Sequence, residues 1–240
     1  MSQKCRQPPA LVRTSDSGYR AWCRSFREKS ETGRSRDPFA QDYHTELMRW
    51  ELVVQKLLAA AIPNSVDERI LFSTQADRKG KVVPIYHELD FVSGTFIEPQ
   101  LFVEIKIREQ SINKKTGWPQ LNRSLSIARA QWPNLRGICV NIAIGDLLGT
   151  EQECTVSTTP IPDLGEAVAD LSQHDGATIW LSGTAVAAFA VKQTLLTHGD
   201  VHRFPDLRRA VLNPTIVLQS PEARPETNRP ALFDQFRPRP

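Results

Sequence analysis

The sequence predicts an α/β fold in which helices flank a central mixed β-sheet, followed by a C-terminal extension. Three observations support this prediction: a long apolar pattern at helical spacing, several segments rich in β-branched and aromatic residues, and a second helical pattern between two apolar strands. Apolar residues make up 40% and charged residues 24% of the 240 residues, which is typical of globular proteins and excludes collagen-like and coiled-coil chains.

The elements follow from local patterns in chain order. Apolar residues repeat at helical spacing over 42–62 until Pro63, and polar turns at 78–81 and 93–94 separate segments of β type. Gly117 and Pro119 close the loop after the clearest strand and open a helix. We therefore expect a helix over 42–62, strands over 68–72, 82–92 and 101–107, a helix over 120–131 and a buried strand over 137–144.

The pattern weakens after Gly145. We expect a strand over 178–181, a helix capped by Ser182 or Thr184 that ends near His198, and a short helix over 206–212. Proline and polar residues then dominate. The expected organisation is a basic arm over 1–40, a core over 41–146, an extension over 147–219 that packs on the core or forms a small subdomain, and a proline-rich tail over 220–240. An apolar island at 231–236 either docks on a protein partner or packs back on its own domain.

The charge distribution and hydropathy of the sequence predict where the protein is located and which kinds of partner it binds. Residues 1–38 hold nine Lys or Arg and four Asp or Glu, a net charge of +5, so this arm either docks on a phosphate backbone or is a solvated leader. The longest apolar run, 185–191, is too short to cross a membrane, and the N-terminus lacks the apolar stretch of a signal peptide. We expect a cytoplasmic protein without a membrane partner. The four scattered cysteines predict free thiols and no zinc site.

The strand over 101–107 carries the residues of most chemical interest. Its alternation places Phe102, Glu104 and Lys106 on one face, where Glu104 and Lys106 form either a solvated pair or part of a site. Asp90 lies in the preceding β-type segment, and the connection is short enough for antiparallel pairing. Asp90, Glu104 and the carbonyl of Ile105 would then form the oxygen cluster that Mg²⁺ prefers, with Lys106 beside the attacking water.

Two further residues extend this candidate site. Glu46 falls in the middle of the apolar stripe of the first helix, whereas Glu51 falls on the far side. A carboxylate directed at a core is costly unless it is paired or binds a metal, so Glu46 either pairs with an arginine such as Arg69 or reaches the same cluster. Gln120 lies in the first turn of the second helix, where anionic ligands are favoured.

The order Glu46, Asp90, Glu104-x-Lys106 and Gln120, on helix, strand, strand and helix, resembles the PD-(D/E)xK nuclease superfamily, over roughly residues 42–145. The resemblance implies a restriction-endonuclease-like core in which Asp90 and Glu104 bind Mg²⁺ or Mn²⁺. It further implies that Lys106 assists the attacking water and that Glu46 and Gln120 support the metal site. Leu89 stands where the family pattern has proline before the first acid.

The resemblance implies a metal-dependent endonuclease that hydrolyses phosphodiester bonds, most often in DNA. Many such enzymes act in restriction, in defence against phage or other foreign DNA, or in mobile-element cleavage, and often as dimers, which makes a homodimer an expectation. Four basic residues near the strand would line the nucleic-acid cleft: Lys114, Lys115, Arg108 and Arg123. The alternative is a non-catalytic nucleic-acid or protein-binding module that uses the basic arm and the C-terminal tail.

Overall fold

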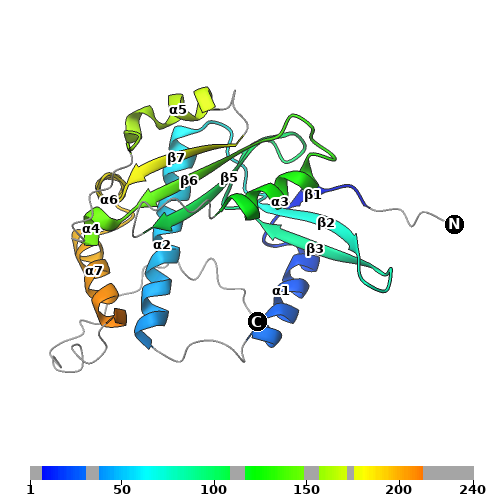
Figure 1. The fold of residues 1–240 in the computed structure, drawn as a ribbon, viewed down its shortest axis with the longest axis horizontal. Coiled ribbons are helices and arrows are strands. Elements are labelled where there is room, and N and C mark those ends of the chain that lie inside the picture. Colours follow the sequence, from blue (N-terminus) through cyan, green and yellow to red (C-terminus); the bar gives the residue numbers. More distant parts are fainter. Residues whose placement is uncertain (1–6, 31–37, 109–116, 149–156, 172–175, 213–240) are drawn as a thin grey trace.

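The protein is an α/β structure with two β-sheets and flanking helices (Figure 1). The computed structural model describes residues 7–30, 38–108, 117–148, 157–171 and 176–212, so the expected tail over 220–240 and its apolar island lie outside the described residues. The strands are β1 (Ala10–Val12), β2 (Ile70–Ala76), β3 (Val82–Glu88), β4 (Phe91–Gly94), β5 (Pro99–Arg108), β6 (Arg136–Ala143) and β7 (Ala177–Ser182). The helices are α1 (Ser17–Ser30), α2 (Pro38–Ala61), α3 (Trp118–Ala128), α4 (Gly145–Leu148), α5 (Leu164–Leu171), α6 (Gly183–Lys192) and α7 (His198–Leu212), with a 3₁₀ turn at Ile161–Asp163.

The larger sheet is mixed and has the strand order β4-β5-β6-β7. β4 runs antiparallel to β5, whereas β5, β6 and β7 are parallel. The smaller sheet is antiparallel, in the order β1-β2-β3. The prediction of a mixed sheet flanked by helices is confirmed, and the smaller sheet is an addition to it.

The two faces of β5 belong to two hydrophobic cores. Leu101, Val103 and Ile105 pack against α2 in a cluster that also contains residues of β6, β7, α6 and α7. Phe102 faces the other way and packs with Leu121 of α3 in a second cluster, which also holds residues of β2. Because side chains alternate along a strand, Glu104 shares the α3 face of β5 with Phe102.

The segment expected as one strand over 82–92 is two strands in different sheets. The break falls at Leu89 and Asp90: the backbone N–H of Leu89 donates to the carbonyl of Arg69, and the Leu89 side chain is buried. Gly94, expected in a turn, ends β4 at a bulge with φ of 110°, and the turn itself is closed by the bond from Thr95 N–H to the Glu98 carbonyl. The chain therefore passes from one sheet to the other directly at Asp90.

Helix boundaries differ from expectation where side-chain and tertiary contacts override local signals. Ser182 caps α6 as expected, but α6 ends at Lys192, before Thr194 adopts a positive φ of 55°. α7 begins at His198 and continues through Pro205. β1, α1, α4 and α5 were not expected. Leu11 of β1 is buried in the second core, so residues expected in a basic arm contribute a strand and core contacts.

The residues after 147 share the main core with the residues before it. β7 extends the four-stranded sheet, and the rings of Tyr43 and Trp50 in α2 contact Phe204 of α7, which is fully buried. Within the described ranges, no helix combines the length and apolar character needed to cross a membrane.

We predict that Phe204→Ala destabilises the whole domain by about 3–5 kcal/mol, because it leaves a cavity between α2 and α7. Urea denaturation followed by circular dichroism measures the loss. Phe96→Ala is the matched control, since Phe96 is 53% exposed, and its effect should stay within about 0.5 kcal/mol. A small early transition for Phe204→Ala, with the main transition unchanged, would show that α7 is not part of the cooperative unit.

Candidate active site

The candidate site forms just before β4 begins, where β5 continues without a strand partner on that side among the described residues. Phe91 is the first residue of β4 and pairs with Val103, so Asp90 lies beside the next stretch of β5. One oxygen of Asp90 accepts a hydrogen bond from the backbone N–H of Ile105 at 2.6 Å. The carboxylate thus takes the place of a backbone acceptor at the edge of the sheet.

The carbonyl of Ile105 lies at the same edge. The N–H and C=O of one strand residue point to the same side, and the Ile105 N–H points to Asp90. The Arg108 carbonyl points the other way and accepts the N–H of Ile144, which follows β6. Asp90 and the Ile105 carbonyl therefore share this edge, as the sequence analysis expects.

Glu104 and Lys106 form an ion pair on the α3 face of β5. The Glu104 side chain is 1% exposed, and its Oε1 has the Lys106 ammonium but no hydrogen bond of good geometry in the described parts of the chain. Gly117 covers this pair: a Cβ on Gly117 would lie 3.2 Å from Lys106 Cγ and 2.9 Å from Cys139 Sγ. Glycine, here with a φ of 101°, lets the start of α3 approach the pair closely.

The acid that α2 contributes is Glu51. Its carboxyl donates a hydrogen bond to Asp90, and it also senses the charges of Lys106 and Glu104. Burial, followed by the negative charge of Asp90, raises the pKa of Glu51 to about 7. Burial, again followed by Asp90, raises the pKa of Glu104 to about 7. Three carboxyls thus lie near the Lys106 ammonium, and the carboxyls of Glu51 and Glu104 are each about half protonated at pH 7.

The pKa values of Asp90 and Lys106, the other two charged groups of the cluster, are also shifted by burial and by neighbouring groups. Burial raises the pKa of Asp90, although the Ile105 N–H and Lys106 act against this shift. Burial alone would lower the pKa of Lys106, but the close contact with the Glu104 carboxylate outweighs it, so the pKa is raised and Lys106 stays protonated. Cys139, opposite Glu104 on β6, has a pKa raised by burial to about 11, which leaves the thiol neutral.

Glu46 lies elsewhere, so the expectation that it reaches this cluster is wrong. It is 8% exposed and faces α7, where Arg49 binds it at 3.8 Å and also binds Asp200 at 2.6 Å. Burial raises the pKa of Glu46, with Arg49 opposing. The alternative partner Arg69 is not there either, because its guanidinium donates to the backbone carbonyl of Asp90. α7 covers the part of the apolar stripe that holds Glu46.

A signal for Glu51 exists in the sequence. On a helical projection, Glu51 lies only about 20° from Leu58, which is fully buried, so it borders the apolar stripe. A carboxylate at the border of the apolar stripe of α2, such as Glu51, can reach the edge of the sheet that α2 covers. A carboxylate in the middle of the stripe, such as Glu46, contacts the element that packs on that face of the helix.

The other expected site residues are spread around the cluster. Gln120 lies in the first turn of α3 near Gly117, but its side chain is exposed and makes no hydrogen bond to the cluster in the described residues. Arg108, two residues beyond Lys106, donates from Nε to Asn141 at 3.3 Å. Arg123 is exposed on α3. Lys114 and Lys115 lie outside the described residues.

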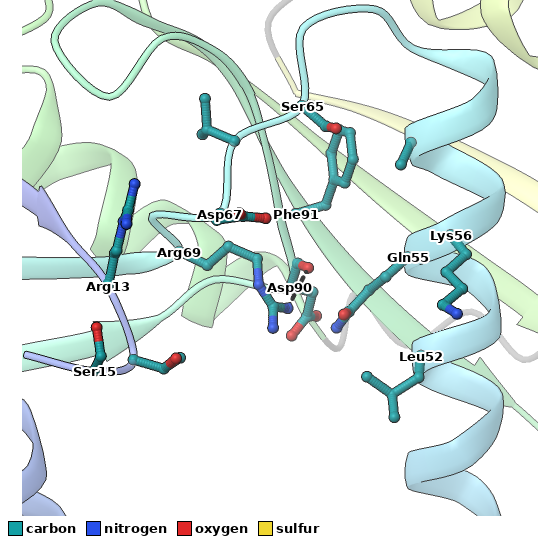
Figure 2. Close-up of a pocket in the computed structure, with 13 residues that line it drawn as sticks. Arg13, Ser15, Leu52, Gln55, Lys56, Ser65, Asp67, Arg69, Asp90 and Phe91 are labelled. Carbon is teal, nitrogen blue, oxygen red and sulfur yellow. Dashed lines mark hydrogen bonds between the residues drawn. The ribbon is translucent and has the colours of Figure 1, made fainter. Parts of the chain in front are cut away.

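A groove of about 450 Å³ opens beside Asp90 (Figure 2). One wall is α2, with Gln55 and Lys56, and the opposite wall consists of residues 13–15, 65–67 and 69. Figure 2 shows Asp90, Arg69 and Gln55 directed toward one another across this groove. The Asp90 edge of the cluster is therefore accessible to a ligand.

We predict that Glu51→Gln stabilises the protein at pH 8 by about 1 kcal/mol and has a smaller effect near pH 5. The pKa of Glu51 is raised on folding, so its protonated form adds stability at low pH, and this contribution is lost as pH rises through about 7. Glutamine mimics the protonated form at every pH. Urea denaturation between pH 5 and 8 measures the difference, with Glu98→Gln on the exposed β4–β5 turn as control. An identical pH dependence in Glu51→Gln and the wild type would contradict this electrostatic account.

Comparisons with protein-family profiles, curated proteins and solved structures find no match for this chain. The case for a function therefore depends on the arrangement of Glu51, Asp90, Glu104 and Lys106.

Proposed function

We propose that the protein is a metal-dependent endonuclease that hydrolyses phosphodiester bonds in DNA. The observation that carries this proposal is the meeting of Glu51, Asp90 and Glu104 with Lys106 at the sheet edge where β4 begins. Two carboxyls with pKa values raised to about 7 are typical of functional sites rather than of solvated surface pairs. The restriction-endonuclease-like core is part of the proposal.

The residue types suit Mg²⁺ or Mn²⁺. Carboxylates and a backbone carbonyl are the oxygen ligands that these ions take, and Asp90, Glu104, Glu51 and the Ile105 carbonyl would hold the ion. Among the residues described, no three His, Cys, Asp or Glu side chains are already arranged around one point for a metal. Glu51 is instead hydrogen-bonded to Asp90, and Glu104 is paired with Lys106. Binding would require Glu51 to lose its proton and Lys106 to leave Glu104.

Each residue has a distinct part in the proposed hydrolysis. A bound divalent cation would supply positive charge that polarises the phosphate and favours ionisation of water. The Ile105 N–H keeps the Asp90 carboxylate oriented. Lys106, released from Glu104, would orient the attacking water and neutralise the charge that develops on the phosphate oxygens. A water oxygen forms a bond to phosphorus while the bond from phosphorus to the leaving sugar oxygen breaks; the attacking water loses a proton to solvent, and the leaving oxygen takes one from solvent.

We predict that the purified protein cuts supercoiled plasmid in the presence of Mg²⁺ and that Lys106→Ala lowers the rate at least 100-fold. Agarose gels follow the nicked and linear products over time, and circular dichroism checks that the variant is folded. Cutting that survives Lys106→Ala would reject this site. A wild-type protein that binds DNA without cutting it would favour the non-catalytic module.

Two matched variants on α2 test which glutamate of this helix acts in cutting. Glu51→Gln should lower the cutting rate at least tenfold, which corresponds to about 1.4 kcal/mol in the barrier. Glu46→Gln carries the same chemical change at the α7 contact and should stay within about twofold of the wild type. A larger loss of cutting rate in Glu46→Gln than in Glu51→Gln would show that Glu46 is the acid of α2 that acts in cutting.

We also predict that Mg²⁺ or Mn²⁺ binding releases protons below pH 7 and strengthens as pH rises to about 8. The carboxyls with pKa values near 7 are largely protonated at pH 6.5 and must ionise to become ligands. Isothermal titration calorimetry in two buffers with different ionisation enthalpies measures the release. Asp90→Asn should remove binding and Glu98→Gln should preserve it. Equal binding by Asp90→Asn and the wild type would show that the ion binds elsewhere.

A further inference from the structure

The groove beside Asp90 carries cationic side chains from three separate segments. Arg13 follows β1, Lys56 projects from α2, and Arg69 begins the approach to β2. Asp67 and Asp90 are the acids of its lining. None of the three cations was part of the site expected from the sequence, and the groove brings them together only through the packing of α2 beside the small sheet (Figure 2).

Of these three cations, Arg69 is the one that contacts Asp90. One of its terminal nitrogens donates to the Asp90 carbonyl at 3.0 Å, which fixes the guanidinium against the residue that leads into β4. Its other donors have no hydrogen-bond partner in the described segments, and Figure 2 shows the guanidinium beside Asp90 at the groove. A planar guanidinium held by one nitrogen presents its remaining N–H groups as a preoriented fork, which matches phosphate oxygens.

Lys56 and Arg13 differ in how readily they reach a ligand. Arg13 is bound by Glu68 at 2.6 Å, which occupies its Nε. Lys56 is exposed on the α2 wall and makes no hydrogen bond or ion pair within the described portion of the chain. An unpaired ammonium across the groove from Arg69 provides a second contact for an anionic chain, and the two cations face the groove from opposite walls.

We propose that this groove binds the phosphate backbone of the nucleic-acid strand next to the bond that is cut, with Arg69 contacting the phosphate nearest Asp90 and Lys56 a neighbouring phosphate. The inference rests on the proposed nuclease function, because that function places the scissile phosphate at Asp90. A volume of about 450 Å³ lies within the range of ligand-binding pockets. Gln55, between Lys56 and Asp90 in Figure 2, supplies a neutral polar group along the same path. DNA and RNA share this backbone chemistry.

Binding in the absence of divalent ions tests the groove separately from catalysis. Fluorescence anisotropy with the full-length protein in EDTA, at 50 to 200 mM salt, uses labelled single-stranded and duplex DNA and an RNA of the same sequence. We expect Lys56→Glu to weaken binding at least tenfold, and Arg69→Lys, which keeps the charge but loses the fork, to weaken it threefold to tenfold. For Lys56→Ala, the slope of log K against log salt should fall by about 0.9 for duplex and 0.7 for single strands, the loss of one phosphate contact.

Lys79→Glu is the charge-matched control, because Lys79 is exposed on the β2–β3 turn outside the groove, and it should stay within twofold of the wild type. Lys56 has no partner to lose among the described residues, so its variants separate a binding defect from a folding defect. Equal effects of Lys56→Glu and Lys79→Glu, or no nucleic-acid binding by the wild type, would overturn the inference. Cutting of plasmid with unchanged binding in the groove variants would reject the groove and leave the nuclease, whereas groove-dependent binding without cutting would reject the nuclease and leave the groove.

Discussion

The hydrogen bond from the Ile105 N–H to the Asp90 carboxylate is the interaction on which the site depends. β4 must separate from β5 for the chain to reach the smaller sheet, and this separation leaves a backbone donor at the edge of the larger sheet. Unpaired buried donors are costly, so the carboxylate that replaces the missing strand both satisfies the donor and is held by it. One residue thereby ends strand pairing and defines the position around which the other charged groups collect.

Burial controls the electrostatics of that position. Glu51 approaches from α2, Glu104 and Lys106 lie on the α3 face, and Asp90 lies at the edge between them. The Lys106 ammonium and the Arg69 guanidinium do not offset the burial of three carboxyls, so the pKa values of Glu51 and Glu104 are raised to about 7. Such a cluster takes up additional positive charge readily. The groove that reaches Asp90 favours the opposite charge, because Arg69 and Lys56 on its walls attract anions.

Some residues of the site can be predicted from the sequence, and others cannot. Asp90, Glu104 and Lys106 follow from period-two alternation and a short antiparallel connection, because a strand determines which side chains share a face. The choice between Glu46 and Glu51 depends on what covers each side of α2. Glu46 occupies a stripe position that α7 covers, where Arg49 and Asp200 meet it. Arg69 lies in the groove because the chain bends at Leu89, where the Leu89 N–H donates to the Arg69 carbonyl and the Arg69 guanidinium donates to the Asp90 carbonyl. No local sequence pattern predicts this bend.

The sequence alone determined the long helix before the strands, the strands on either side of α3 and the residues that share a face with Glu104. These features depend on contacts between residues close in the chain or on the alternation of a single strand. Tertiary structure alone decided that residues 82–92 divide between two sheets and that β1 joins the smaller sheet. It also decided that Glu46 lies at the contact between α2 and α7, whereas Glu51 faces Asp90. Each of these depends on which distant surfaces bury one another, and the amino-acid pattern of one segment does not specify its partner.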